Sequence, residues 1–282
     1  MPTKPFGKTG VALPVIGQGT WDIAERGTGK TRAIEALRRG IELGMTHIDT
    51  AEMYGSGRVE EIVGEAIHPY DRERLFITSK VLPSNASYGK AIAACERSLR
   101  RLKLDHLDLY LLHWPSEYPL RETMRAFDAL VESGKTRFVG VSNFEEDEMT
   151  EAAGLLRARL ACNQVLYHMR ERGIERRLVP AGARANVAIV GYTPFGRGRF
   201  PREESRPDGV LGRIARERAA TPRAVILAFL TREENAFTIP KASSREHVEE
   251  NARAGALTLT AQEVAEIDAA FPIGEDGPLA SL

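Results

Sequence analysis

The chain has 282 residues, and its 39 basic residues balance 39 acidic ones, so the formal net charge is zero. This balance argues against a general attraction to nucleic acid or to an anionic membrane surface. No apolar run approaches the roughly 18 residues of a membrane span, and the first residues do not resemble a secretory signal. The two cysteines, Cys95 and Cys162, lie in no ligand cluster, so neither a metal nor a disulfide framework is expected. We therefore expect a cytoplasmic protein.

After a predicted N-terminal hairpin over residues 4–12, short apolar and β-branched runs alternate with helical patterns. The runs predict eight strands, at residues 15–16, 46–48, 75–78, 107–112, 137–141, 161–166, 187–192 and 236–239. Apolar stripes at helical spacing lie within 34–41, 92–102 and 127–131, and further helices are predicted at 145–156, 174–185, 222–232, 245–253 and 261–271. Thr221 before Pro222 and Thr260 before Glu263 are typical of helix starts. Residues 194–212, rich in Gly, Pro and Arg, are predicted to form one long loop.

Eight strands, nearly all followed by a helix, indicate a parallel α/β fold, which we expect to be a single domain over residues 1–282. A closed barrel and an open doubly wound sheet both fit this order. The even spacing along the chain favours a (β/α)8 TIM barrel with a short N-terminal hairpin and extra helices. In such a barrel, the chemistry takes place on the loops that follow the strands.

Four polar residues lie where this rule places a catalytic site. Asp49 follows the second predicted strand, and Tyr54 lies five residues later in the same loop. Lys80 and His113 follow the next two strands. Taken singly, each is more often structural, because such a lysine is usually solvated, such a histidine is usually hydrogen-bonded and such a tyrosine usually packs. Together, on three consecutive strands, they suggest carbonyl reduction.

When a hydride reaches a carbonyl carbon, negative charge develops on the oxygen, which needs a proton donor and a hydrogen-bond donor. A tyrosine with a pKa of about 10 donates poorly at neutral pH. A neighbouring ammonium lowers that pKa because it stabilises the phenolate. Tyr54 is thus the candidate proton donor, and Lys80 is the group that tunes it. Asp49 would hold Lys80 charged and in place, and His113 would orient the carbonyl.

The sequence also resembles the aldo-keto reductase family, of the bacterial NADPH-dependent type, over nearly its whole length. The resemblance lies in GMTHIDTAEMYGSGRVEEIVGEAI, ITSKV, LYLLHWP, GVSNF, NQV and IPKASSREHVEEN, in the family's order. It implies a (β/α)8 barrel with a nicotinamide cofactor extended across the carboxyl ends of the strands. It also implies a catalytic tetrad of Asp49, Tyr54, Lys80 and His113, in which Tyr54 is the general acid in reduction and the base in oxidation.

Residue by residue, the resemblance implies a cofactor site and a substrate pocket. Ser142, Asn143 and Gln164 match the side chains that hold the nicotinamide carboxamide. Tyr192 matches the ring on which the nicotinamide stacks. The other matched cofactor contacts are Gly19, Thr20, Trp21, Asp49, Thr193, Phe195, Gly196, Lys241, Ser243, Ser244, His247 and Asn251. The matched substrate contacts are Tyr54, His113 and two aromatic walls, Trp21 and Trp114.

One position departs from the family's pattern. Many NADPH-using members have an arginine at the 2′-phosphate, and this chain has His247 at the matching position. A neutral histidine is a weaker phosphate partner than arginine, whose charge and forked geometry persist. Because Lys241 is kept, we still expect NADPH, with NADH as a less favoured cofactor.

Other motifs suggest rival functions. Residues 24–31, AERGTGKT, resemble a phosphate-binding P-loop of an NTPase, but Ala24 stands where that motif needs its first glycine. Gly17 and Gly19 could begin a dinucleotide-binding GxGxxG, but Asp22 stands at the third glycine. A third alternative is a barrel that binds the nicotinamide cofactor as a sensor or regulatory subunit without turnover. The intact tetrad favours a reductase.

The predicted function is therefore hydride transfer from NADPH to small aldehydes or ketones. The tail after the last predicted helix, residues 272–282, is short. We expect a short tail to leave the pocket open for small or varied carbonyl compounds. A monomer is the default for the family.

Overall fold

The computed structural model describes residues 1–23, 29–197, 200–275 and 277–281. An eight-stranded parallel sheet forms its centre, with the strands arranged in chain order. The strands are β3 (Gln18–Gly19), β4 (His47–Asp49), β5 (Phe76–Val81), β6 (Leu107–Leu112), β7 (Thr136–Ser142), β8 (Leu160–Leu166), β9 (Ala188–Tyr192) and β10 (Ala236–Thr238). Parallel bridges from Ile16 to Thr238 and from Gly19 to Lys241 join the two edges of the sheet. The sheet is therefore closed into the predicted barrel.

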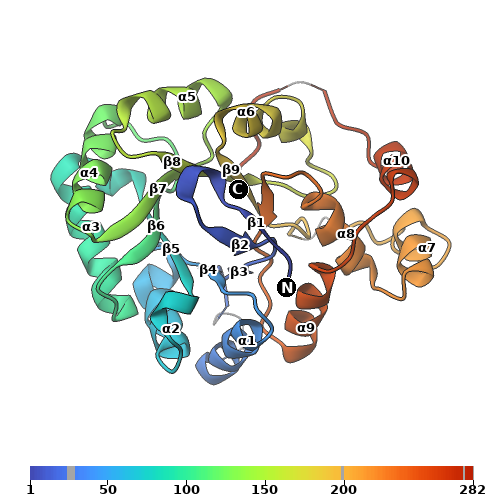
Figure 1. Ribbon diagram of the computed structural model, residues 1–282. Coiled ribbons are helices and arrows are strands. Elements are labelled where there is room, and N and C mark those ends of the chain that lie inside the picture. Colours follow the sequence, from blue (N-terminus) through green and yellow to red (C-terminus); the bar gives the residue numbers. More distant parts are fainter. Residues whose placement is uncertain (24–28, 198–199, 276, 282) are drawn as a thin grey trace.

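Helices surround the barrel (Figure 1). They are α1 (Lys30–Glu42), α2 (Arg58–Ile67), α3 (Tyr88–Leu102), α4 (Leu120–Glu132), α5 (Glu146–Leu155), α6 (Leu178–Ala185), α7 (Val210–Glu217), α8 (Pro222–Leu230), α9 (Arg245–Ala254) and α10 (Ala261–Ala270). Most of these helices are amphipathic and bury one face. In α3, for example, Ala91, Cys95, Leu99 and Leu102 recur at helical spacing and are buried. The alternation of strand and helix confirms the predicted (β/α)8 fold.

The predicted N-terminal hairpin is also present, as β1 (Thr3–Pro5) paired with β2 (Ala12–Pro14). Between these strands, Phe6 is completely buried, and its ring lies edge-on to Phe76 at 5.5 Å and to Phe237 at 5.1 Å. Gly7 has a φ of +52°, and a Cβ there would lie 2.5 Å from the carbonyl oxygen of Ala161. Because Phe76 is the first residue of β5, the hairpin covers the amino end of the barrel. The carboxyl end is left uncovered by the hairpin.

Some elements differ from their predicted bounds. The first barrel strand is Gln18–Gly19 rather than residues 15–16, where Ile16 makes only an isolated bridge. The predicted loop over 194–212 ends early, because α7 begins at Val210 and buries Leu211, Ile214 and Ala215. The helix predicted at 174–185 is a 3-10 turn, Gly173–Glu175, followed by α6. Helix α2 was not among the predicted helices.

The two predicted helix starts are confirmed. The Thr221 hydroxyl accepts a hydrogen bond from the backbone N–H of Ala224, and Thr260 forms a reciprocal capping box with Glu263. None of the helices in the described part of the chain has the length and apolar character to cross a membrane. The P-loop-like segment falls largely on residues 24–28, which lie outside the described residues.

Candidate active site

The four predicted tetrad residues lie together at the carboxyl ends of three neighbouring strands. Asp49 is the last residue of β4, and Lys80 lies inside β5 rather than beyond its end. His113 directly follows β6, and Tyr54 begins a 3-10 turn after β4. Parallel pairing of β4, β5 and β6 brings these side chains, which are far apart in the sequence, to one edge of the barrel.

The Lys80 ammonium lies at the centre of this group and is completely buried. It donates to Oδ1 of Asp49 at 2.5 Å, to the carbonyl oxygen of Thr50 at 2.9 Å and to the hydroxyl of Tyr54 at 3.3 Å. Burial lowers the pKa of Lys80, but the Asp49 carboxylate and Tyr54 together raise it by more, so its pKa lies above the ordinary value. Lys80 is therefore a fixed positive charge beside the Tyr54 hydroxyl.

The Tyr54 hydroxyl stays protonated at neutral pH. Burial raises the pKa of Tyr54 by more than the Lys80 charge lowers it, so the net direction is upward. The lowering effect that was expected of Lys80 is present, but the expected net fall in the Tyr54 pKa is not. The physical reason is that a phenolate would lose its hydration in this site. A protonated hydroxyl is the form that a proton donor requires.

His113 is the neutral member of the group. Its ring lies edge-on to Tyr54 with centroids 5.8 Å apart. Burial, and secondly the Lys80 charge, lower the pKa of His113 to about 3, so the imidazole carries no charge at neutral pH. Its buried Nδ1 has no hydrogen-bond partner within the described part of the chain. A neutral imidazole offers one donor and one acceptor without adding a second cation beside Lys80.

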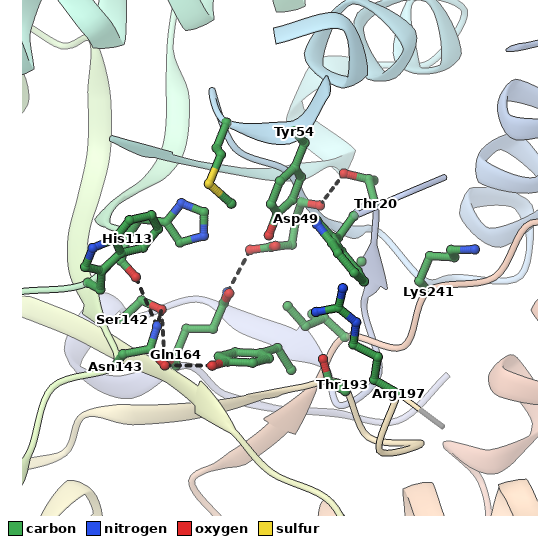
Figure 2. A pocket seen from close by; sticks show the side chains of 16 residues that line it. Thr20, Asp49, Tyr54, His113, Ser142, Asn143, Gln164, Thr193, Arg197 and Lys241 are labelled. Atoms are coloured by element: carbon green, nitrogen blue, oxygen red, sulfur yellow. Dashed lines mark hydrogen bonds between the residues drawn. The ribbon is translucent and has the colours of Figure 1, made fainter. Parts of the chain in front are cut away.

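A network of amide and hydroxyl groups lies next to the tetrad. The Ser142 hydroxyl donates to the carbonyl oxygen of Gln164 at 2.8 Å, and the Tyr192 hydroxyl donates to Oδ1 of Asn143 at 2.8 Å. Nε2 of Gln164 donates to Oδ2 of Asp49 at 2.7 Å. Figure 2 shows Ser142, Asn143 and Gln164 gathered on one side of the pocket, below His113 and Asp49. The network is thus joined to the tetrad through Asp49.

The amide network and the tetrad residues Asp49, Tyr54 and His113 line a cavity of about 220 Å³ at the mouth of the barrel. The predicted residues that line it are Gly19, Thr20, Trp21, Asp49, Tyr54, His113, Trp114, Ser142, Asn143, Gln164, Tyr192, Thr193 and Lys241. Three lining residues, Met53, Arg197 and Ile239, were not predicted. Met53 directly precedes Tyr54 and Arg197 directly follows Gly196. For these two residues, adjacency to a predicted residue is the only sequence signal that could have found them.

The other predicted cofactor contacts do not line this cavity. Phe195, which precedes Gly196, packs under the guanidinium of Arg223, 4.3 Å from its ring centroid. The remaining ones belong to the start and body of α9, where the Ser244 hydroxyl accepts a hydrogen bond from the backbone N–H of His247 at 3.4 Å. They are Ser243, Ser244, His247 and Asn251, and only Asn251 among them is buried.

The pocket residues fit a nicotinamide dinucleotide. A primary carboxamide needs both donors and acceptors, and the side chains of Ser142, Asn143 and Gln164 provide both. The Tyr192 ring is fixed by its bond to Asn143 and offers a flat apolar surface. Lys241 lines the same cavity and supplies a positive charge for a phosphate. These residues would hold the nicotinamide end beside the Tyr54 hydroxyl and the phosphates toward α9.

Comparison with known proteins places the chain in a family. The model of the aldo/keto reductase family matches residues 15–271. Methylglyoxal reductase YeaE of Escherichia coli is 42% identical over 263 residues, which cover 93% of this chain and 92% of the relative. Glyoxal reductase of Bacillus subtilis is 34% identical over 262 residues, covering 92% and 90% respectively. The chain therefore belongs to the aldo/keto reductase family, as its motifs predicted.

Solved structures agree with this assignment. An aldo/keto reductase from Klebsiella pneumoniae in complex with NADP and acetate superposes with a TM-score of 0.91 at 38% identity, covering 100% of both chains. A structure of aldo-keto reductase from the same organism in complex with NADPH gives a TM-score of 0.92 at 38% identity, again over 100% of both chains. The predicted fold class is thereby confirmed.

Proposed function

We propose that the protein reduces small aldehydes or ketones with NADPH and that Tyr54 is the general acid. One observation carries this proposal. The Tyr54 hydroxyl faces the cavity and lies 3.3 Å from a Lys80 ammonium that Asp49 holds at 2.5 Å. A buried cation next to a protonated phenol stabilises the phenolate that remains once the proton has been given away.

When bound, NADPH supplies the hydride. The residues of this chain orient the reactants and supply the proton. The amide network and the Tyr192 ring would orient the nicotinamide. The Tyr54 hydroxyl gives its proton to the carbonyl oxygen as negative charge develops there. Lys80 stabilises the phenolate, and Asp49 keeps Lys80 from moving toward the substrate. The neutral His113 donates a hydrogen bond to the same carbonyl oxygen, which fixes its position.

The predicted enzyme class and cofactor are confirmed by the relatives. The curated relatives are reductases, and the solved structures named above contain NADP or NADPH. The named substrates of these relatives, methylglyoxal and glyoxal, are small dicarbonyl compounds. We therefore propose small 2-oxoaldehydes as the first substrates to test, with the enzyme acting as a cytoplasmic monomer.

The test is NADPH oxidation followed by absorbance with methylglyoxal, glyoxal, simple aldehydes and ketones. Tyr54→Phe should lower kcat by about 10²–10⁴-fold, the usual contribution of a general acid. NADPH binding to that variant should be unchanged, because the phenyl ring keeps the shape of the pocket. The matched control is Tyr70→Phe, because the Tyr70 hydroxyl bonds to the carbonyl oxygen of Arg38 outside the pocket. This control should keep full activity.

Full activity in Tyr54→Phe would overturn the proposed mechanism. NADPH binding without turnover of any compound in the panel would favour the sensor instead. The two results can be told apart, because the first is measured on the Tyr54→Phe variant and the second on the wild-type protein.

A further inference from the structure

The loop after β4 continues the parallel pairing with β5 beyond the last residue of β4. The backbone N–H of Thr50 donates to the carbonyl oxygen of Thr78 at 2.9 Å. Two residues later, the N–H of Glu52 donates to the carbonyl oxygen of Lys80 at 3.3 Å. This spacing of two residues on each strand is that of a parallel ladder, so the loop remains attached to the strand that contains Lys80.

The next hydrogen bond in this series comes from the Glu52 side chain. In a regular parallel ladder, the main-chain carbonyl oxygen of Glu52 would accept from the N–H of Leu82, because one residue bonds to both neighbours of its partner. Instead, Oε1 of Glu52 accepts from that N–H at 2.8 Å, and it also accepts from Nδ2 of Asn85 at 2.9 Å. Oε2 of Glu52 lies 3.5 Å from Nη2 of Arg97. The Glu52 side chain is only 6% exposed, so water competes little for these bonds.

This replacement allows the main chain to turn away from the sheet directly after Glu52. Met53 has helical backbone angles, with φ −70° and ψ −30°. The N–H of Tyr54 then donates to the carbonyl oxygen of Ala51 at 3.1 Å, which closes a tight turn. The turn brings the Tyr54 hydroxyl to 3.3 Å from the Lys80 ammonium. Figure 2 shows the Tyr54 side chain directed into the pocket.

We propose that Glu52 is a positioning residue for the proton donor. Its carboxylate completes the ladder in place of a main-chain carbonyl and thereby fixes the distance between the Tyr54 hydroxyl and the Lys80 ammonium. Glu52 does not line the cavity, so it acts on the reaction only through Tyr54. The kinetic effect of Glu52 rests on the proposed function, in which Tyr54 is the acid, whereas the effect of Glu52 on the turn does not.

Three variants test this role. In Glu52→Gln, the amide oxygen can accept from Leu82 and Asn85 as the carboxylate does. In Glu52→Leu, a side chain of similar size has no acceptor and leaves the Leu82 N–H without its partner. Arg97→Gln is the matched control, because it removes the ion pair to Oε2 and keeps both hydrogen bonds to Oε1. Glu52→Gln should therefore rescue the effects of Glu52→Leu, and the control should behave as the wild type.

The first arm measures amide hydrogen exchange by NMR and needs no turnover. Glu52→Leu should speed the exchange of the Leu82 N–H about tenfold, which is the effect of losing one hydrogen bond. The Tyr54 N–H should exchange faster as well, because its turn is no longer fixed. Faster exchange at Leu82 alone, with the wild-type rate at Tyr54, would overturn the positioning role. Wild-type rates at both residues would show that the Glu52 bond does not form in solution.

The second arm measures kinetics at a temperature at which all the variants are folded. With NADPH and methylglyoxal, Glu52→Leu should lower kcat about ten- to a hundredfold, because a small displacement of the donor is costly. The KM values for both ligands should stay near those of the wild type, since Glu52 does not line the cavity. In alcohol oxidation with NADP⁺, where Tyr54 is the base, the apparent pKa of kcat should rise. Burial raises the pKa of Tyr54 and the Lys80 charge lowers it, and a greater distance from Lys80 weakens the lowering effect.

A role in stability alone would change neither the kcat nor the pH profile of the folded enzyme. Wild-type values of both in Glu52→Leu would therefore show that the inference is wrong. An equal loss of kcat in Glu52→Gln, which keeps the acceptor, would also overturn it. If the wild type reduces no carbonyl compound, the proposed function fails, while the hydrogen-exchange arm still decides whether Glu52 fixes the turn of Tyr54.

Discussion

Gln164 donates a hydrogen bond from Nε2 to Oδ2 of Asp49 at 2.7 Å, across the floor of the active-site cavity. Lys80 occupies the other oxygen of the same carboxylate at 2.5 Å. Asp49 is only 1% exposed, so both oxygens depend on protein donors. A side chain assigned to the nicotinamide thus also helps to keep the Asp49–Lys80 pair in place.

Two substitutions at Gln164 should separate these effects. Gln164→Leu removes a hydrogen bond to a charged group and should lower the free energy of unfolding by about 1.5–3 kcal/mol, with no added titrating group. Gln164→Glu places a second carboxyl against Asp49, and burial and like charge raise the pKa of the new group in the folded state. The Gln164→Glu variant should therefore keep its stability below the pKa of about 4.3 that a glutamate has in the unfolded chain. It should lose stability as the pH rises through the higher pKa of the folded state.

Urea unfolding of both variants at pH 5 and pH 8 measures this difference. Equal losses at the two pH values for Gln164→Glu would show that Gln164 does not contact Asp49 in solution.

A buried histidine in the barrel should make stability sensitive to acid. His47 is 1% exposed, with Nε2 3.1 Å from Oγ1 of Thr78. Burial lowers the pKa of His47 to about 4. A depressed folded-state pKa contributes stability that is present above the unfolded pKa of about 6.5 and is lost as the pH falls through the folded value. The free energy of unfolding should thus fall by about 1.4 kcal/mol per pH unit for this group between those values.

His47→Gln keeps a hydrogen-bonding side chain but does not titrate. Its unfolding free energy, measured by urea at several pH values from 4 to 7, should show a shallower slope than the wild type. His68→Gln, at an exposed residue, is the control and should keep the wild-type slope. A wild-type slope in His47→Gln would mean that His47 is protonated in the folded protein.

Two exposed residues, Lys241 before α9 and His247 in its first turn, should set the cofactor preference. Lys241 and His247 are both exposed, and Lys241 also lines the cavity. Lys241→Ala should raise the Michaelis constant for NADPH about tenfold and leave that for NADH nearly unchanged, because only NADPH has the 2′-phosphate. His247→Arg should lower the NADPH constant, because arginine keeps its charge and forked geometry. Equal changes for the two cofactors would exclude a 2′-phosphate role.

Two members of the tetrad could be predicted because they interrupt a strong pattern. Lys80 and His113 are polar residues at the ends of buried apolar strands, which is costly without a function or a partner. The strand around Lys80 extends further than its apolar run, because backbone pairing with β6 continues to Val81. Sequence patterns report side-chain polarity well, but the exact end of a strand depends on its neighbour.

Arg197 and Met53 could not be predicted in the same way. Their place in the pocket depends on the course of loops that contain residues with positive φ, such as Thr193 and Arg197. Periodicity carries no information on the direction of such loops. Helix α7 was not predicted because Gly209 and Gly212, at and near its start, are residues typical of loops. Its buried Leu211 and Ile214 become informative only when the barrel is present.

The C-terminal tail should not control substrate choice. Nε of Arg176 donates to the carbonyl oxygen of Gly274 at 3.0 Å, and the backbone N–H of Leu279 donates to Oε1 of Glu145 at 2.5 Å. None of the described residues after Pro272 lines the cavity. Deletion of residues 273–282 should therefore leave the ranking of kcat/KM among aldehydes and ketones unchanged. It should lower the free energy of unfolding by about 0.5–1.5 kcal/mol for each lost hydrogen bond. Arg176→Gln, which keeps the tail but weakens its attachment, should give a smaller loss of stability and the same ranking. A changed ranking in the truncated enzyme would mean that the tail reaches the pocket when substrate is bound.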